Sequence, residues 1–99
     1  YIILESNHDE QMLKIGSYPM YLKKRILGKF GHMSNDLTAE TATRLASTGT
    51  KHIMLAHLSN ENNTPEIAEI TTKSALCGAG YENIDLSVAS RYEISTFKN

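Results

Sequence analysis

The sequence predicts an α/β fold, and three observations indicate it. Short apolar runs at residues 1–4 and 53–56 have the length and composition of buried strands. A polar loop follows each run, and segments with helical periodicity follow the loops. Such an alternation over short connections is typical of a partly parallel sheet with helices packed on it.

The first element is a strand at residues 1–4, which runs directly into a polar loop at residues 5–10. Ser6 or Asn7 is a favourable N-cap for a short helix, and Gly16 is suited to end it. The pattern of a strand followed by a polar loop therefore begins at the first residue.

A longer helix is predicted from about residues 34–36, all three of which are good N-caps, to residue 47. Ala42 and Ala46 lie on one face of this helix, where small side chains allow close packing on a sheet. Gly49 is expected to end the helix shortly before the next strand.

The central stretch is residues 51–65, in which a predicted strand is followed directly by His57 and a polar turn. Thr64 and Pro65 then read as an N-cap and a first helical residue, so a second long helix begins there and ends at residues 78–80. Because ligands gather at the carboxyl ends of strands in open α/β sheets, His57 lies where a site is expected.

One or two short strands at residues 86–89 and 92–96 complete the order β-α-α-β-α-β(β). The 99 residues suffice for one small domain at most. The chain opens in an apolar strand and lacks an initial methionine, whereas termini are usually polar. We therefore expect residues 1–99 to be a single fragment of a longer protein.

The formal net charge of -1 excludes a dedicated basic nucleic-acid-binding domain. Positive charge is local, and it can be interpreted as a solvated helix face or as a phosphate-contacting patch. The cluster consists of Lys23, Lys24, Arg25 and Lys29.

The single cysteine, Cys77, excludes an internal disulfide, fits a reducing compartment and is expected to be buried. No apolar stretch is long enough to span a bilayer, and no signal peptide opens the chain. The sequence thus predicts a soluble, cytoplasmic protein without membrane contact.

Three of the four histidines, His8, His32 and His57, fall in polar loops, whereas His52 starts a strand. No pair has the H-x-H, H-E-x-x-H or C-x-x-C spacing of a local metal site. A lone loop histidine is more often a hydrogen-bonding surface residue than a ligand. Composition and spacing alone therefore indicate an α/β fragment with a polar site at the strand ends.

Three motifs, at residues 5–9, 25–35 and 55–65, carry a resemblance in their order and spacing. Together they resemble the C-terminal part of metallo-β-lactamase-fold hydrolases of the YycJ (WalJ) type, exonucleases related to ribonuclease Z. The resemblance covers nearly the whole chain. It implies the C-terminal half of an αββα sandwich, with a mixed sheet, helices packed on it and metals at the sheet ends.

The resemblance also implies roles for loop residues. His57 would be a metal ligand, and His32 would be a catalytic residue that contacts the scissile phosphate or assists proton transfer. For His32 the alternative is an ordinary neighbour of a helix cap. Further side chains could line the site, or could merely satisfy the loop backbone and cap helices: Asn7, His8, Asp9, Ser59, Asn62 and Asn63.

The implied cofactors are two divalent metal ions, zinc or alternatively manganese. The H-x-H-x-D-H signature of the family is absent from the chain, and a single histidine cannot hold such a centre. We therefore expect the fragment to be inactive alone. Its expected partners are the N-terminal half of the same domain, a nucleic acid substrate and, through exposed strand edges, a second copy of itself.

The resemblance favours a phosphodiesterase or exonuclease in which metal ions activate the attacking water. Two alternatives remain. In one, the chain is a non-catalytic interaction or scaffold fragment whose polar loops only cap helices. In the other, the intact enzyme hydrolyses a thioester or a lactam.

Overall fold

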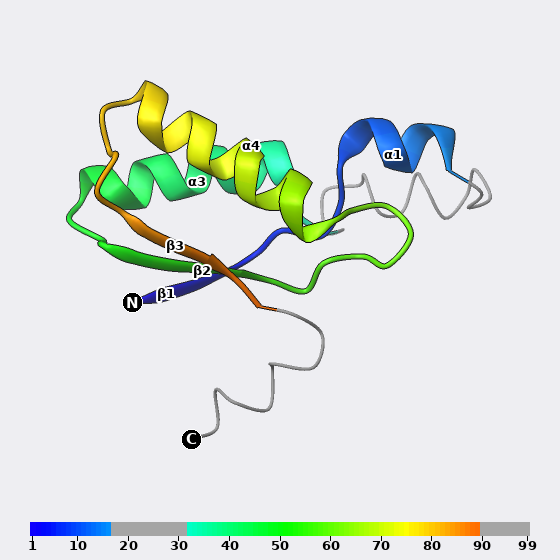
Figure 1. The fold of residues 1–99 in the computed structure, drawn as a ribbon, viewed down its shortest axis with the longest axis horizontal. Helices are drawn as coiled ribbons and strands as arrows, with labels where there is room; N and C mark the ends of the chain where they lie inside the picture. Colours follow the sequence, from blue (N-terminus) through cyan, green and yellow to red (C-terminus); the bar gives the residue numbers. More distant parts are fainter. Residues whose placement is uncertain (17–31, 90–99) are drawn as a thin grey trace, which may run out of the picture.

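The computed structural model describes residues 1–16 and 32–89 (Figure 1). The described strands form one sheet in the order β1-β2-β3, and both neighbouring pairs are parallel. The strands are β1 (Ile2–Glu5), β2 (His52–Ala56) and β3 (Asp85–Val88). The helices are α1 (Glu10–Ile15), α3 (Asn35–Ser47) and α4 (Pro65–Gly78).

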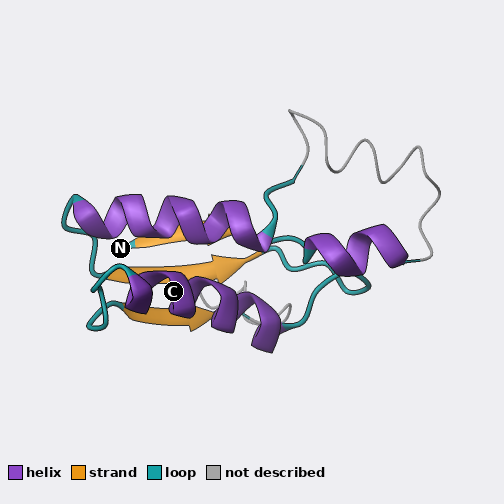
Figure 2. Cartoon of the chain, turned by 90° about the horizontal axis from the view of Figure 1, so that it is seen from above, coloured by secondary structure: helices purple, strands orange, loops and turns teal. Residues whose placement is uncertain are grey.

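Helices α3 and α4 lie on the same face of the sheet (Figures 1 and 2). Helix α3 precedes β2, which pairs with β1, and α4 connects β2 to β3. Crossovers between parallel strands have one preferred hand, so two successive steps in the same direction place their helices on one face. The result is two layers, one of helices and one of strands.

The hydrophobic core lies between these layers. Ile53 and Leu55 of β2 are fully buried against Ala42 and Ala46 of α3, and α4 adds Ala68 and Leu76. The alanines let the helix backbones approach closely, as the small residues in the sequence predicted. Strand β2 is thereby fixed as the centre of the sheet.

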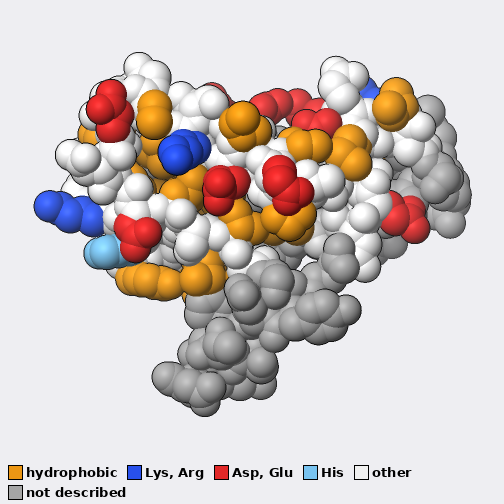
Figure 3. All heavy atoms as spheres, in the orientation of Figure 1, with side chains coloured by type: hydrophobic (Ala, Val, Ile, Leu, Met, Phe, Trp, Pro, Cys, Tyr) orange, Lys and Arg blue, Asp and Glu red, His pale blue; other side chains and the backbone are white. Residues whose placement is uncertain are grey.

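The other face of the sheet is covered by none of the described helices or strands. Ile3 of β1 is 48% exposed, and its register partner Met54 is only partly buried. Figure 3 shows hydrophobic side chains gathered along the lower margin of the described part, on the strand side. The prediction that β1 is a buried strand is therefore wrong, because Ile2 and Leu4 are only partly buried and Ile3 is exposed.

Local capping sets where the helices begin. Ser34 Oγ accepts the Leu37 N–H at 3.1 Å, and Thr64 Oγ1 accepts the Ile67 N–H at 3.1 Å, as predicted. Helix α1 is capped by Asp9, whereas the sequence favoured Ser6 or Asn7.

The end of α3 is also as predicted. Gly49 follows the helix with φ 107°, a left-handed conformation that glycine adopts without a Cβ clash.

The predicted α/β class is confirmed, whereas the sheet is wholly parallel in the described residues and not mixed. Cys77 is exposed at the end of α4 and not buried as expected. The predicted strand at 92–96 and the basic cluster around residues 23–29 lie outside the described residues.

None of the helices in residues 1–16 and 32–89 has the length and apolar character needed to cross a membrane.

Candidate active site

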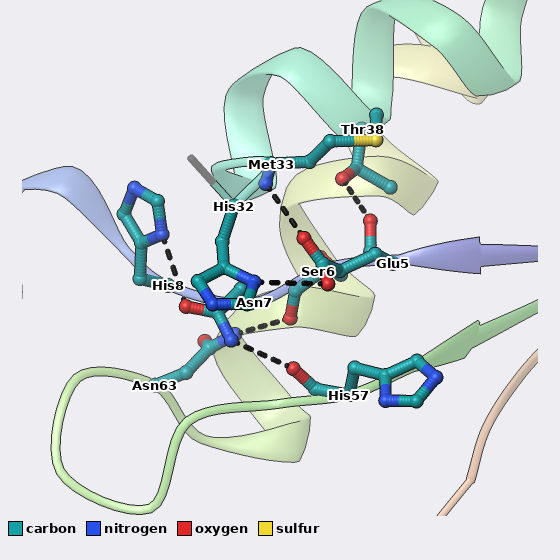
Figure 4. A network of polar contacts seen from close by, with 9 residues as sticks. All are labelled: Glu5, Ser6, Asn7, His8, His32, Met33, Thr38, His57 and Asn63. Atoms are coloured by element: carbon teal, nitrogen blue, oxygen red, sulfur yellow. Dashed lines mark hydrogen bonds and ion pairs between the residues drawn. The ribbon is translucent and has the colours of Figure 1, made fainter. Parts of the chain in front are cut away.

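Three polar loops meet at the carboxyl edge of β1 and β2 (Figure 4). The backbone N–H of Asn7, after β1, donates to the Met33 carbonyl at 2.9 Å and so joins the loop before α3. The backbone N–H of Ser59, after β2, donates to the Asn7 carbonyl at 2.7 Å. The structure thus brings together the three segments that carry the histidine motifs.

His32 is held by a carboxylate that the sequence analysis did not single out. Its Nδ1 lies 3.1 Å from Oε2 of Glu5, while Glu5 Oε1 accepts the Met33 N–H at 2.8 Å. The imidazole is 56% exposed and the carboxylate 26%. Because Nδ1 is engaged, Nε2 is the ring nitrogen left for a ligand, in the arrangement by which a carboxylate orients a catalytic histidine.

His57 follows β2 directly and is exposed. Among the non-glycine residues that the structure describes, His57 is the one with a left-handed backbone, at φ 59°. Its imidazole makes no hydrogen bond to a described residue, and Figure 4 shows it turned away from the rings of His8 and His32. The ring is therefore free to bind a ligand from outside the described part.

The described residues do not make a metal site by themselves. They contain no group of three histidine, cysteine, aspartate or glutamate side chains close enough to hold an ion. A tetrahedral zinc site needs at least three protein ligands. The described residues therefore do not form a complete centre of this kind.

His8 differs from the other loop histidines because its side chain is buried, with 1% exposure. Its Nδ1 lies 3.3 Å from Asn7 Oδ1, and its Nε2 is buried without a hydrogen-bond partner. Burial, and next the nearby His32, lowers the pKa of His8, so the ring is neutral at pH 7. A neutral buried ring supports the loop and does not line an open surface.

The side chains of Asp9 and Ser59 each accept a hydrogen bond from a backbone N–H group. Asp9 Oδ2 accepts the Met12 N–H at 3.0 Å, which starts α1. Ser59 Oγ accepts the Asn62 N–H at 3.2 Å inside the turn after β2. Neither side chain bonds to the imidazole of His57.

Asn62 and Asn63 are both buried beneath the turn. The carbonyl of Asn62 accepts the Asp9 N–H at 2.8 Å, which ties the turn to the first loop. Asn63 Oδ1 accepts the N–H of Thr64, the residue that caps α4, at 2.9 Å. The two asparagines thus fix the turn that carries His57 without a hydrogen bond to its ring.

A buried network beneath the loops was missed by the sequence analysis. Asn35 and Asn63 exchange two amide hydrogen bonds of 2.8 and 2.9 Å, and Ser6 Oγ donates to Asn35 Oδ1. Asn63 Nδ2 also donates to the Ser6 carbonyl at 2.9 Å. The signal available in the sequence was only that each of these residues adjoins a predicted strand or helix end. The network locks one residue from each loop to the other two.

Two exposed or half-buried carboxylates lie beside the loops, Glu10 in the first turn of α1 and Asp36 in that of α3. A hydrogen bond with Asp36, and next partial burial, raises the pKa of Glu10. Beside Asp36, the Glu10 carboxyl group therefore holds a proton more readily than an isolated one would.

The fold and the site define a parallel α/β unit with histidine-bearing loops at the carboxyl edge of its sheet. Comparison with known proteins gives relatives. The chain is 41% identical over 92 residues to the exodeoxyribonuclease WalJ of Streptococcus pneumoniae (strain D39), a match that covers 93% of the chain and 32% of that protein. It is 42% identical over 79 residues to the exodeoxyribonuclease YycJ of Bacillus anthracis, covering 80% of the chain and 30% of that protein.

The predicted resemblance to the YycJ (WalJ) type is confirmed by these matches. The chain spans about a third of the length of the curated relatives it matches. No family model and no solved structure matches the chain.

Proposed function

We propose that this chain is the C-terminal portion of a metal-dependent nuclease that hydrolyses phosphodiester bonds in DNA, and that it is inactive by itself. The observation that carries the proposal is the Glu5–His32 pair, held at the same sheet edge as the exposed His57. The names of the relatives, which are exodeoxyribonucleases, support DNA as the substrate.

In this proposal His57 supplies one ligand to a centre of two divalent ions, zinc or manganese. The other ligands come from the part of the protein that precedes this chain. Bound there, the ions would polarise the phosphodiester and activate water. The chain's own contribution is to present an unhindered imidazole on a rigid turn.

His32 serves as a catalytic residue in the same proposal. Glu5 fixes its Nδ1 and would stabilise the imidazolium, whose Nε2–H could then donate to a phosphate oxygen or transfer its proton to the leaving group. The alternative is that His32 is an ordinary neighbour of Ser34, the residue that caps α3.

The remaining half of the domain would pack on the sheet face that the described helices leave open, around Ile3 and Met54. This arrangement would complete an αββα sandwich and bring further ligands to the carboxyl edge. We place the enzyme in the cytoplasm, where a single cysteine stays reduced.

The test compares three histidine variants of the full-length protein. His57→Ala should lower the metal content and abolish degradation of end-labelled DNA, and His32→Ala should lower kcat at unchanged metal content. His52→Ala is the matched control, because His52 is exposed at the opposite end of β2. Unchanged metal content and activity in His57→Ala would refute the assignment.

A substrate panel tests the reaction class. We expect hydrolysis of DNA, and no hydrolysis of a thioester or a lactam, by the metal-loaded full-length protein. Thioester hydrolysis without nuclease activity would reject the phosphodiester proposal.

A further inference from the structure

Asn7 makes four hydrogen bonds that reach both neighbouring loops and His8. Its backbone bonds to Met33 and Ser59, as described above. Its side-chain Nδ2 donates to the carbonyl of His57 at 3.0 Å, and its Oδ1 faces Nδ1 of His8 at 3.3 Å. Figure 4 shows Asn7 between the two histidines.

The chemistry of these groups fixes the direction of each bond. The carbonyl of His57 can only accept, so Asn7 must turn its NH₂ toward it. Oδ1 of Asn7 then faces His8, and because this oxygen can only accept, Nδ1 of His8 must carry a proton. In the neutral ring Nε2 consequently carries no proton. The buried Nε2 has no hydrogen-bond partner, and in this tautomer no N–H group is left unsatisfied there.

We propose that His8 and Asn7 form a positioning relay, from imidazole to amide to carbonyl, that holds the backbone of His57 in its left-handed conformation. The inference rests on the proposed function in one respect, that the imidazole of His57 ligates a metal. Neither His8 nor Asn7 touches the metal in this account. Both are positioning residues that act through His57.

The relay has a clear mechanical basis. Among the described non-glycine residues, His57 is the one whose φ lies in the left-handed region, at 59°. Such a backbone persists only where its surroundings hold it. The bond from Asn7 to the His57 carbonyl is a direct restraint on this peptide, and the Ser59-to-Asn7 bond restrains the turn two residues later. Without the amide donor, the direction of the imidazole would no longer be defined.

The first experiment measures the tautomer of His8 in the unaltered protein. Long-range ¹H–¹⁵N correlation NMR of ¹⁵N-histidine-labelled protein separates the two neutral tautomers, and the His8 signals are assigned by their loss in His8→Asn. We expect the Nδ1–H form, although free imidazole side chains favour the Nε2–H form. A neutral His8 with its proton on Nε2 would overturn the relay.

The second experiment removes the donor and keeps the shape. Asn7→Asp still accepts from His8 but presents an acceptor to the His57 carbonyl. In a chelator-competition titration of the full-length protein, we expect zinc affinity to fall about 10- to 100-fold. Asn60→Asp is the matched control, because it adds the same charge at an exposed side chain in the turn after β2, which carries His57, and its affinity should stay within about twofold of the unaltered protein.

The outcomes separate the relay from the proposed function. Zinc affinity that is unchanged in Asn7→Asp but lost in His57→Ala would overturn the relay and leave the metal assignment intact. Unchanged affinity in His57→Ala would overturn the metal assignment itself. If Asn7→Asp does not fold, the tautomer of His8 in the unaltered protein still decides whether the relay exists.

Discussion

Glu5 uses both of its carboxylate oxygens at the candidate site. One accepts the backbone N–H of Met33 and the other faces Nδ1 of His32. The carboxylate therefore positions the loop and the imidazole together. It also selects the tautomer with the proton on Nδ1, which leaves Nε2 of His32 as the reactive nitrogen.

Replacing Glu5 by glutamine should separate these two tasks. The amide oxygen can still accept from Met33, but its NH₂ then faces Nδ1 of His32 and reverses the tautomer. We expect kcat of the full-length nuclease to fall by at least about 100-fold with KM nearly unchanged. Steady-state kinetics on labelled DNA would measure this, with the exposed Glu61→Gln as control. A kcat equal to that of the control would contradict a role for the pair.

His8 makes stability depend on pH, and the sign follows from its lowered pKa. In the unfolded chain the pKa is about 6.5, and in the folded chain it is lower, so between the two values the unfolded state binds more protons. The free energy of unfolding should therefore be highest above about pH 6.5 and decrease as the pH falls through the folded-state pKa.

Urea unfolding at about pH 7.5 and about pH 5.5 would measure this effect as a difference between two proteins. His8→Asn keeps a donor close to the position of Nδ1 but does not titrate in this range. The unaltered protein should lose more stability on acidification than His8→Asn. An equal loss would show that protonation of His8 is not coupled to unfolding.

At the scale of residues, the sequence predicted which side chains lie at the candidate site better than it predicted which residues they bond to. His32 and His57 could be identified as candidates because each adjoins a predicted strand or helix end. The partner of His32 could not, because Glu5 is 27 residues away and pairs with it only when β1 lies beside α3. The buried Asn35–Asn63 pair, 28 residues apart, was missed for the same reason.

At the scale of elements, Gly16 marks where α1 meets the turn after β2. A Cβ at this position would lie 2.8 Å from Asn62 Oδ1 and 2.9 Å from the Met12 carbonyl oxygen, which is fixed backbone. Gly16→Ala should therefore cost about 1–3 kcal/mol of stability through overpacking.

The matched control for this change is Gly78→Ala in the last turn of α4. A Cβ there meets nothing within 4 Å, so alanine should be neutral or stabilise by up to about 1 kcal/mol through its helix propensity. Thermal or urea unfolding of both variants would decide. Equal effects of the two substitutions would show that the contact with Asn62 does not matter.

The helices could be predicted because their signals are local. Ser34, Thr64 and Pro65 specify helix starts within a few residues, and the structure confirms them. The start of α1 was less certain because several N-cap residues compete there. Asp9 prevails, since its backbone N–H is fixed by Asn62 from a distant turn, and no local pattern contains that bond.

For the whole molecule, alternating elements sufficed to predict a sheet with helices on it. They did not reveal that both long helices cover the same face, which follows from the strand order β1-β2-β3. The exposure of Ile3 follows from the same order, because Ile3 lies on the face that neither long helix covers. A short apolar run predicts a strand, but it cannot say how many of the strand's faces are covered.

The open sheet face leads to a prediction for the isolated 99-residue chain. Ile3 is 48% exposed beside the partly buried Met54, and both β1 and β3 end the described sheet with unpaired edges. Apolar surface and strand edges of this kind favour association with a second copy when the natural cover is absent. Light scattering coupled to size exclusion should therefore show a dimer or larger species, and Ile3→Lys should shift it toward the monomer.

Ile70→Lys is the control, because Ile70 is 64% exposed but lies on α4, away from the open face, and its substitution should leave association unchanged. A monodisperse monomer of the unaltered chain would contradict the prediction and mean that the face is covered within the chain itself.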